Sequence, residues 1–199
     1  MQPKEVAASY DTIASRWQSA SFDRTNGIAA LTRALAFCQT KGNALDVGCG
    51  SSGRFIERLL EEGFSVAGLD LSSEMVRLAQ RRHPQVTFHL EDICQWVLPK
   101  RYELIAAWDS IWHIPLDQHE PVLAKLMASL NPGGVCLFSM GGLDAPGEVT
   151  NTAMGPPMYH STPGIPKTLD LVDRGGCVCR HLEYDQFPEP HVYLIIQKR

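Results

Sequence analysis

The segment ALDVGCGSSGRF, from Ala44 to Phe55, has the residues best suited to binding a ligand. Its apolar beginning predicts a buried strand that ends at Gly48, and residues 54–62 have the apolar spacing of a helix. Gly50 and Gly53 lie between these two elements. Glycines let the backbone turn sharply and approach a ligand closely, and the first turn of a helix has unpaired N–H groups. A strand, a glycine turn and a helix in this order predict a cradle for a nucleotide-like ligand.

Asp46 is an acidic residue inside this predicted strand, two residues before Gly48. The glycine spacing also fits the dinucleotide fingerprint G-x-G-x-x-G, with Asp70 twenty residues after Gly50 to hold a ribose. A carboxylate beneath the turn would repel a pyrophosphate, whereas it would attract a ligand with a cationic end. We therefore favour a cationic nucleoside. A dinucleotide site and a plain strand–turn–helix with an incidental acid remain the alternatives.

Composition predicts one domain and disfavours several classes of protein. The chain has 199 residues, of which 44% are hydrophobic, enough for one sizeable core. The net charge is −4 and the basic residues are scattered, which disfavours nucleic-acid binding. No apolar run approaches a membrane span and residues 1–9 have no signal-peptide core, so we expect a cytoplasmic protein. The six cysteines have no C-x-x-C spacing, so we expect reduced core thiols and no metal site.

Strands and helices alternate along most of the chain. Two amphipathic helices, with apolar faces at residues 6–17 and 28–38, precede the first strand. We expect further strands at 64–69, 86–90, 102–107 and 135–140, helices starting at Ser72 or Ser73 and at Pro121, a turn at 131–134, and a short helix at 167–173. This alternation predicts a parallel sheet with its ligand at the carboxyl ends of the strands.

The end of the chain departs from that alternation. Residues 177–184 and 192–198 read as strands, and the connection between them is too short for a helical crossover. They predict an antiparallel hairpin. We therefore expect an α/β fold, a three-layer sandwich with a mostly parallel seven-stranded sheet, an antiparallel C-terminal hairpin and N-terminal helices. A six-stranded parallel dinucleotide domain would lack such a hairpin.

The D-x-G-x-G-x-x-G pattern at 46–53, the terminal hairpin and the segment YDTIASRW at 10–17 resemble class I S-adenosylmethionine (SAM) methyltransferases of the small-molecule type. The resemblance covers nearly the whole chain. It implies a single domain over 1–199. Its parts would be a helical cap (1–40), a SAM-binding core (41–140), an acceptor lid (141–166), and a C-terminal helix and hairpin (167–199).

The resemblance also implies where the nucleoside part of SAM would bind. Asp70, at the end of the second strand, would accept hydrogen bonds from both ribose hydroxyls, and Leu71 and Met75 would flank the adenine. Asp92 and Ile93, just after the third strand, would lie near the adenine amino group and ring.

The methionine part of SAM would lie near the N-terminal segment. There Tyr10, Arg16 and Trp17 would cover the cofactor, with Arg16 pairing with its carboxylate as a fork. Trp108 stands where the family often has a small or polar residue, so it is either a contact to the sulfonium or a core residue. The complete predicted cofactor set is Tyr10, Arg16, Trp17, Asp46, Gly48, Cys49, Gly50, Gly53, Asp70, Leu71, Met75, Asp92, Ile93 and Trp108.

Catalytic residues are harder to predict, because methyl transfer mainly requires an aligned nucleophile and exclusion of water. His113, in the loop after the fourth strand, is the first candidate base, and a structural histidine bonded to the backbone is its alternative. Asp109 is a candidate for orienting an amine or hydroxyl acceptor, with a solvated loop residue as the alternative. Residues 141–166 read as a long irregular stretch, and we expect this lid to contribute Tyr159 and His160 as acceptor contacts.

The sequence thus predicts methyl transfer from SAM to a small molecule, with release of S-adenosylhomocysteine (SAH). The alternatives are an NAD(P)-dependent oxidoreductase and a non-catalytic SAM-binding protein. We expect no nucleic-acid or membrane partner, and a monomer or homodimer. No residue indicates whether N, O, S or C is methylated.

Overall fold

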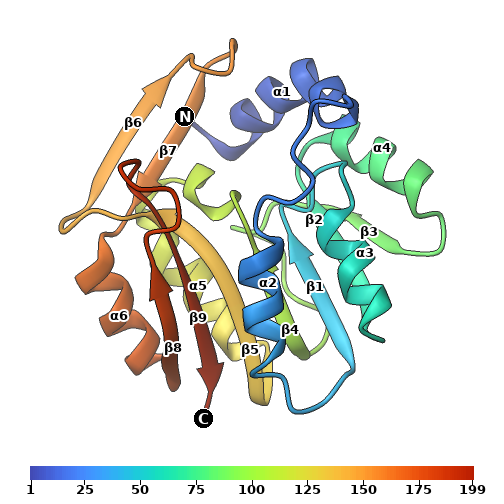
Figure 1. Cartoon of the computed structure of the whole chain (residues 1–199). Helices are drawn as coiled ribbons and strands as arrows, with labels where there is room; N and C mark the ends of the chain where they lie inside the picture. The colour runs from blue at the N-terminus through green and yellow to red at the C-terminus, as the bar shows by residue number, and fades with distance from the viewer.

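A seven-stranded sheet forms the centre of the computed structural model, which describes residues 1–199 (Figure 1). The strand order is β3-β2-β1-β4-β5-β9-β8. The strands are β1 Asn43–Val47, β2 Ser65–Asp70, β3 Thr87–Leu90, β4 Tyr102–Ala107, β5 Leu130–Gly141, β8 Cys177–Glu183 and β9 His191–Lys198. The first five pair in parallel, and β9 runs antiparallel to both β5 and β8. The expected fold class, including the terminal hairpin, is confirmed.

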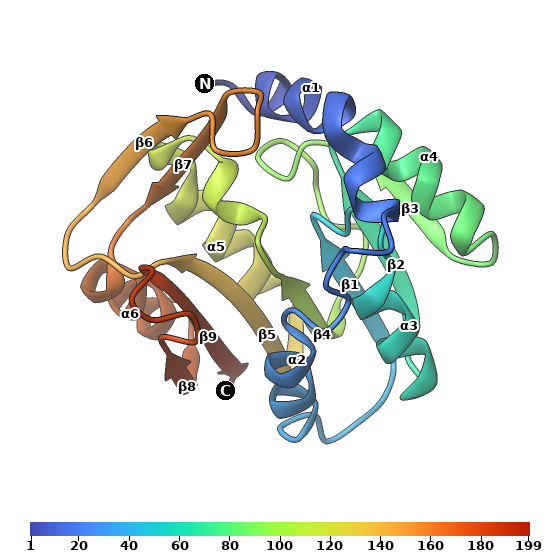
Figure 2. The same cartoon turned by 45° about the horizontal axis from the view of Figure 1, so that its top comes forward.

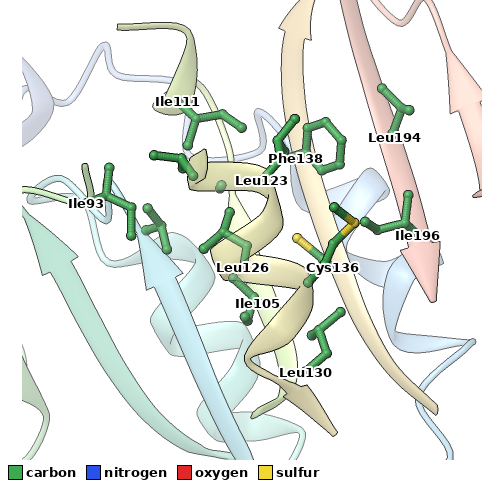
Figure 3. Close-up of a cluster of buried hydrophobic side chains, with 14 of the residues drawn as sticks. Ile93, Ile105, Ile111, Leu123, Leu126, Leu130, Cys136, Phe138, Leu194 and Ile196 are labelled. Carbon is green, nitrogen blue, oxygen red and sulfur yellow. The ribbon is translucent and has the colours of Figure 1, made fainter. Parts of the chain in front are cut away.

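The sheet is covered on both faces because successive residues of a strand point to opposite sides. In β4, Leu104 and Ala106 pack with helices α2 (Ile28–Leu35) and α3 (Arg54–Glu61) in one buried cluster. Ile105 and Ala107 pack with α5 (His119–Ala128) and α6 (Ile165–Arg174) in the other. Figure 3 shows α5 against the sheet, with Leu123 and Leu126 directed at the side chains of β4 and β5. The two clusters join the sheet to helices on each of its faces, and the result is a three-layer structure.

Two further elements lie above the carboxyl ends of the parallel strands, helix α1 (Pro3–Ile13) and the hairpin of β6 (Gly147–Asn151) with β7 (Met158–Thr162) (Figure 2). The chain continues from α1 into the 3-10 turn η1 (Ala14–Gln18), and two more such turns, η2 (Ile111–His113) and η3 (Leu116–Gln118), lie between β4 and α5.

Helix α1 and the β6–β7 hairpin form a roof over the strand ends, and hydrogen bonds hold α1 on two sides. The Asp11 carboxylate accepts hydrogen bonds from the Ser72 hydroxyl (2.6 Å) and the Glu74 amide (3.0 Å), at the start of α4 (Ser73–Arg82). A carboxylate at a helix N-terminus is favourable, because the unpaired amides and the helix dipole both attract it. On the other side, the Ser9 hydroxyl donates to the Pro157 carbonyl in the β6–β7 turn (2.8 Å). The roof therefore closes over the strand ends through these polar contacts and through a small apolar cluster of Val6, Ile13, Met158 and Tyr159.

The structure corrects the sequence-based elements in two places. The stretch 141–166, expected to be irregular, contains the β6–β7 hairpin. Its sequence hides the hairpin because the β6 residues are largely exposed and have no apolar alternation. The expected turn at 131–134 lies within β5, where the pairing with β4 shifts register. Elsewhere the elements agree to within a few residues, and Ser72 is the N-cap of α4, its hydroxyl accepting from the Met75 amide (3.1 Å).

No helix in the structure combines the length and the apolar character needed to span a membrane.

Replacing Leu126 by Ala should lower the free energy of unfolding by about 2–5 kcal/mol, because Leu126 is fully buried between α5 and the sheet. The matched control is Leu169→Ala on α6, where the leucine is 37% exposed and the expected loss is about 0.5 kcal/mol. Urea unfolding of both variants, followed by circular dichroism, measures the two losses. Equal small losses would contradict this packing.

Candidate functional site

A cavity of about 330 Å³ lies between the roof and the carboxyl ends of the parallel strands. Its 29 lining residues come from α1 and the segment after it, the glycine turn, the ends of β2 and β3, the segment 108–114, and the hairpin turn. Its volume is within the range of small-molecule sites. The cavity lies at the edge where a parallel α/β sheet binds its ligands.

The glycine turn forms one wall of this cavity. Gly48, Gly50 and Gly53 all have positive φ angles (70°, 55° and 69°), which only glycine adopts without strain. A Cβ on Gly48 would lie 2.2 Å from the Ser110 Cβ, so this position also needs the absence of a side chain. Gly50 has no atom within 4 Å of where its Cβ would be, so its backbone is open to a ligand.

Asp70 fixes the conformation of this turn. Its carboxylate accepts hydrogen bonds from the Gly50 amide (2.8 Å) and the Ser72 amide (2.9 Å). Burial raises the pKa of Asp70, and these backbone donors partly counteract that rise. Asp70 therefore joins the glycine turn, the end of β2 and the start of α4, while its side chain lines the cavity.

Asp46 lies beneath the turn and is not part of the cavity wall. It is 5% exposed, and burial raises its pKa to about 7, against the opposing effect of the Arg54 charge. A nearby cation would favour its ionised form. Its effect on a ligand would therefore be electrostatic, through the floor of the site.

Arg54 is the one cationic side chain among the lysines and arginines that reaches the cavity wall. Its Nε donates to the Asn26 carbonyl (2.8 Å) and its Nη1 to the Ser52 hydroxyl (3.0 Å). Arg16, the arginine predicted from sequence to hold a carboxylate, is exposed and donates to the Met154 carbonyl (2.9 Å). The sequence feature that could have identified Arg54 as a cavity residue is its position at the start of the helix after the third glycine.

His113 lies at the centre of a hydrogen-bond network that joins the roof to the sheet. Its Nδ1 lies 2.7 Å from the Tyr159 carbonyl, so Nδ1 must carry the proton and donate it. Its Nε2 is then the acceptor for the Tyr10 hydroxyl (2.8 Å) and the Trp112 indole N–H (2.9 Å). Burial lowers the pKa of His113 to about 4, so the ring is neutral near pH 7.

Asp109 lies on the opposite side of the cavity from Asp70, in the segment after β4. Its carboxylate accepts from the Asn26 side-chain amide (3.1 Å) and lies 2.9 Å from His191 Nε2. The other ring nitrogen of His191 lies 2.5 Å from the Asp185 carboxylate. Sequence reasoning did not find His191, because it starts β9, more than eighty residues from Asp109, and only the sheet brings the two together.

The remaining predicted residues divide between the cavity wall and its surroundings. Those that line the cavity are Tyr10, Trp17, Gly48, Cys49, Gly50, Asp70, Leu71, Met75, Asp92, Ile93, Trp108, Asp109, His113 and His160. Four do not line it. They are Arg16, Asp46, Gly53 and Tyr159. Gly53 faces His83, and the Tyr159 hydroxyl donates to Glu148 (2.6 Å) at a separate surface depression.

The side chains of this arrangement suit the non-covalent binding of a polar nucleoside. Asp70 offers carboxylate oxygens beside exposed backbone of the glycine turn, Arg54 offers a cation, and Leu71, Met75 and Ile93 offer apolar surface. The residues of the wall thus fit the groups of SAM, namely a ribose, an adenine, and an amino acid with a carboxylate.

Comparisons with known sequences agree with this chemistry. Residues 44–134 match a family model described as a methyltransferase domain. The chain is 31% identical over 140 residues to trans-aconitate 2-methyltransferase of Rhodopseudomonas palustris (strain HaA2), a match covering 68% of this chain and 54% of the relative. It is 35% identical over 96 residues to dTDP-4-amino-2,3,4,6-tetradeoxy-D-glucose N,N-dimethyltransferase of Saccharopolyspora spinosa, covering 47% and 38%. The chain spans about half the length of the curated relatives it matches.

Solved structures share the fold. Magnesium protoporphyrin IX methyltransferase from Synechocystis PCC 6803, with bound SAM, superposes with a TM-score of 0.74 at 18% identity, covering 100% of this chain and 98% of that one. A SAM-dependent methyltransferase from Clostridium acetobutylicum ATCC 824 superposes with a TM-score of 0.71 at 12% identity, covering 96% and 98%. These matches give no support to the dinucleotide alternative.

The His113 ring should remain neutral, with its proton on Nδ1, as the pH is lowered to about 5. Protonation would place a charge on a buried ring, and it would remove the Nε2 lone pair that accepts from Tyr10 and Trp112. Nitrogen-15 NMR of labelled imidazole rings measures this, with His113→Gln for assignment. Free histidine in the same buffer serves as the reference ring. Titration of His113 near pH 6.5 would contradict the network.

Proposed function

We propose that this chain, a member of the class I S-adenosylmethionine-dependent methyltransferases, binds SAM in the cavity and transfers its methyl group to a small molecule, releasing SAH. The observation that carries the proposal is the Asp70 carboxylate fixed beside the open Gly50 backbone, at the carboxyl edge of a seven-stranded sheet of this family's topology. When bound, SAM supplies a methyl group already activated by its sulfonium.

The residues of the wall divide into those for the nucleoside and those for the amino acid. Asp70 would accept hydrogen bonds from the ribose hydroxyls, Leu71 and Met75 would flank the adenine, and Asp92 and Ile93 would meet its edge and face. All five line the cavity, four of them at the ends of β2 and β3 and Met75 from the first turn of α4.

Arg54 is our choice for the partner of the SAM carboxylate, in place of Arg16. Arg54 lines the cavity, whereas Arg16 does not line it and donates to the Met154 carbonyl of the hairpin turn. Tyr10 and Trp17, whose rings are 5.5 Å apart, would cover the same end from the roof. Asp46 would act through the floor, where its ionised form is favoured by a sulfonium.

Approximation of the acceptor and exclusion of water would be the main catalytic contributions of the protein. Helix α1 and the hairpin supply the roof that excludes water. His113, with both ring nitrogens already hydrogen-bonded, would hold the Tyr10 hydroxyl in place, and Asp109 is the better candidate for contacting the acceptor. His160 lines the cavity and is a candidate acceptor contact, whereas Tyr159 would act through its backbone carbonyl.

The finer parts of the proposal concern partners and location. We propose a small-molecule acceptor without a nucleic-acid or membrane partner, a monomer or homodimer, and a cytoplasmic location. The scattered basic residues and the net charge of −4 support the first of these, and the apolar burial of the Cys49, Cys136 and Cys177 thiols supports the last. The division of the chain into cap, core, lid and C-terminal hairpin is likewise a proposal, supported by the position of α1 and β6–β7 above the strand ends.

Calorimetric titration with SAH and with NADH tests the function, and we expect SAH alone to bind. Asp70→Asn should weaken SAH binding by about 1–3 kcal/mol, because charged hydrogen bonds are lost. Thermal unfolding of the variant separates this from a disordered glycine turn. NADH binding without SAH binding would refute the proposal, and SAH binding without turnover of any acceptor would favour a non-catalytic SAM-binding protein.

Arg54→Gln should weaken SAH binding about tenfold, while binding of 5′-methylthioadenosine, which lacks the amino acid, should not change, because only the carboxylate contact is removed. The matched control is Arg16→Gln, for which we expect unchanged affinity for both ligands. The same calorimetry measures all four affinities. The reverse pattern, with Arg16 needed and Arg54 not, would return the carboxylate to the residue predicted from sequence.

A further inference from the structure

The charged side chains of the cavity wall are mostly acidic. Asp70, Glu91, Asp92 and Asp109 line it, and Arg54 is the only lysine or arginine that does. If Arg54 is occupied by the carboxylate of SAM, as proposed above, no arginine or lysine remains for an anionic acceptor. Burying an unpaired carboxylate costs far more than burying a paired one. The wall therefore disfavours an anionic acceptor.

The four carboxylates lie on two sides of the central strand β1. Asp70 follows β2, and Glu91 and Asp92 follow β3, which is next to β2 in the sheet. Asp109 follows β4, on the other side of β1, and its partners come from β5 and β9 further along the sheet. The first three lie where the nucleoside would bind, so Asp109 is the carboxylate left for another cation.

A strained backbone conformation and several hydrogen bonds fix the position of Asp109. It is the only residue besides glycines with a positive φ angle (50°), a conformation that must be compensated by its surroundings. Its amide donates to the Ser139 hydroxyl (2.7 Å), and its Oδ2 accepts from the Asn26 amide (3.1 Å). Its side chain remains 29% exposed and lines the cavity.

His191 lies behind Asp109, with its side chain 6% exposed. Its two ring nitrogens face the carboxylates of Asp109 (2.9 Å) and Asp185 (2.5 Å), and only an imidazolium can donate to both. Burial lowers the pKa of His191, but the hydrogen bonds to the two carboxylates outweigh it and raise the pKa above its usual value. A charged His191 pairs with the Asp109 side chain and fixes its direction.

The surfaces around Asp109 suit a cation with polar substituents. Trp108 and Trp112 line the cavity on either side, with ring centroids 5.4 and 5.3 Å from that of His191, and aromatic faces attract cations. Ser110 Oγ and His160 Nδ1 are buried polar atoms without a hydrogen-bond partner, on residues of the same wall. Unused buried polar atoms of this kind can serve the hydroxyl groups of a ligand.

We propose that the acceptor is a small amine whose ammonium group binds to Asp109, and that His191 and Asp185 are positioning residues that hold this carboxylate. The inference rests on the proposed function and specifies its acceptor class. The ammonium loses one proton to solvent before attack, so the nitrogen regains its lone pair, and Asp109 orients the resulting amine by accepting a hydrogen bond from it. In the overall transfer the neutral amine gains the methyl group, the sulfonium becomes a thioether, and the positive charge moves from sulfur to nitrogen.

Binding of three matched probes to the SAH-saturated protein tests the acceptor class without requiring turnover. The probes are benzylamine, benzyl alcohol and benzoate, titrated near neutral pH. We expect benzylamine to bind at least about tenfold more tightly than benzoate, and Asp109→Asn to remove about tenfold or more of the benzylamine affinity while SAH affinity stays within about twofold. The control is Asp170→Asn, the same change at an exposed carboxylate on α6, which should alter neither affinity.

The role of His191 has its own readout. His191→Ala should weaken benzylamine binding as much as Asp109→Asn does, and His191→Gln, whose amide N–H can still reach Asp109, should recover most of the loss. SAH affinity and the melting temperature serve as controls for the fold. Loss of SAH and benzylamine affinity together in His191→Ala, without recovery in His191→Gln, would reduce His191 to a purely structural residue.

The outcomes separate the acceptor class from the function itself. Failure of the wild-type protein to bind SAH would refute the methyltransferase proposal. SAH binding with benzoate preferred, or with no benzylamine binding, would overturn the amine proposal alone. Equal weakening of SAH and benzylamine by Asp109→Asn would also overturn it, because Asp109 would then hold the ammonium of the cofactor.

Discussion

The hydrogen bonds from the Gly50 and Ser72 amides to the Asp70 carboxylate are the constraint on which the rest of the site depends. They join three backbone segments that parallel strands bring to one edge, namely the glycine turn, the end of β2 and the N-terminus of α4. The same side chain is partly buried, which raises its pKa, and the backbone donors counteract that rise because they stabilise the ionised form. The shape of the turn and part of the charge of the site therefore depend on one residue.

The start of α4 also positions the roof. Asp11 of α1 docks on the amides and the hydroxyl at this helix N-terminus, so α1 is oriented by the element that Asp70 fixes. From there α1 reaches the hairpin through Ser9, and the segment after β4 through Tyr10 and His113. A small apolar cluster of Val6, Ile13, Met158 and Tyr159 also joins α1 to β7. Because this cluster is much smaller than the two that hold the sheet, the roof can open at lower cost than the sheet can.

Electrostatics divide the cavity into parts with different tasks. Arg54 lies near the buried Asp46, and each opposes the effect of burial on the other's pKa. The negative charge of Asp109 is balanced by His191, whose other ring nitrogen faces the Asp185 carboxylate. His113, in contrast, is surrounded by neutral donors and acceptors and has lost its usual basicity. A histidine in the loop after β4 is thus the natural sequence-based choice of base, and its surroundings argue against that role.

The sequence alone determined the sheet, its helices and the terminal hairpin, because these depend on local signals. The continuous apolar run of β4, the spacing of Val122, Leu123 and Leu126 on α5, and the glycines at Gly48 and Gly50 act within a few residues. Most predicted cofactor residues reached the cavity wall for the same reason, since all of those on the wall except Tyr10 and Trp17 lie at or just after the end of a parallel strand.

Only the tertiary structure decided contacts between residues far apart in the chain. The sequence around Arg16 and around Arg54 is compatible with either arginine lining the cavity. In the structure Arg16 donates to the Met154 carbonyl of the hairpin turn, and Arg54 lines the cavity. His191 meets Asp109 because antiparallel β9 brings its first residue to the end of the sheet where β4 ends. A side chain's type is local, but its ionisation and its partner depend on what the fold places within a few ångströms of it.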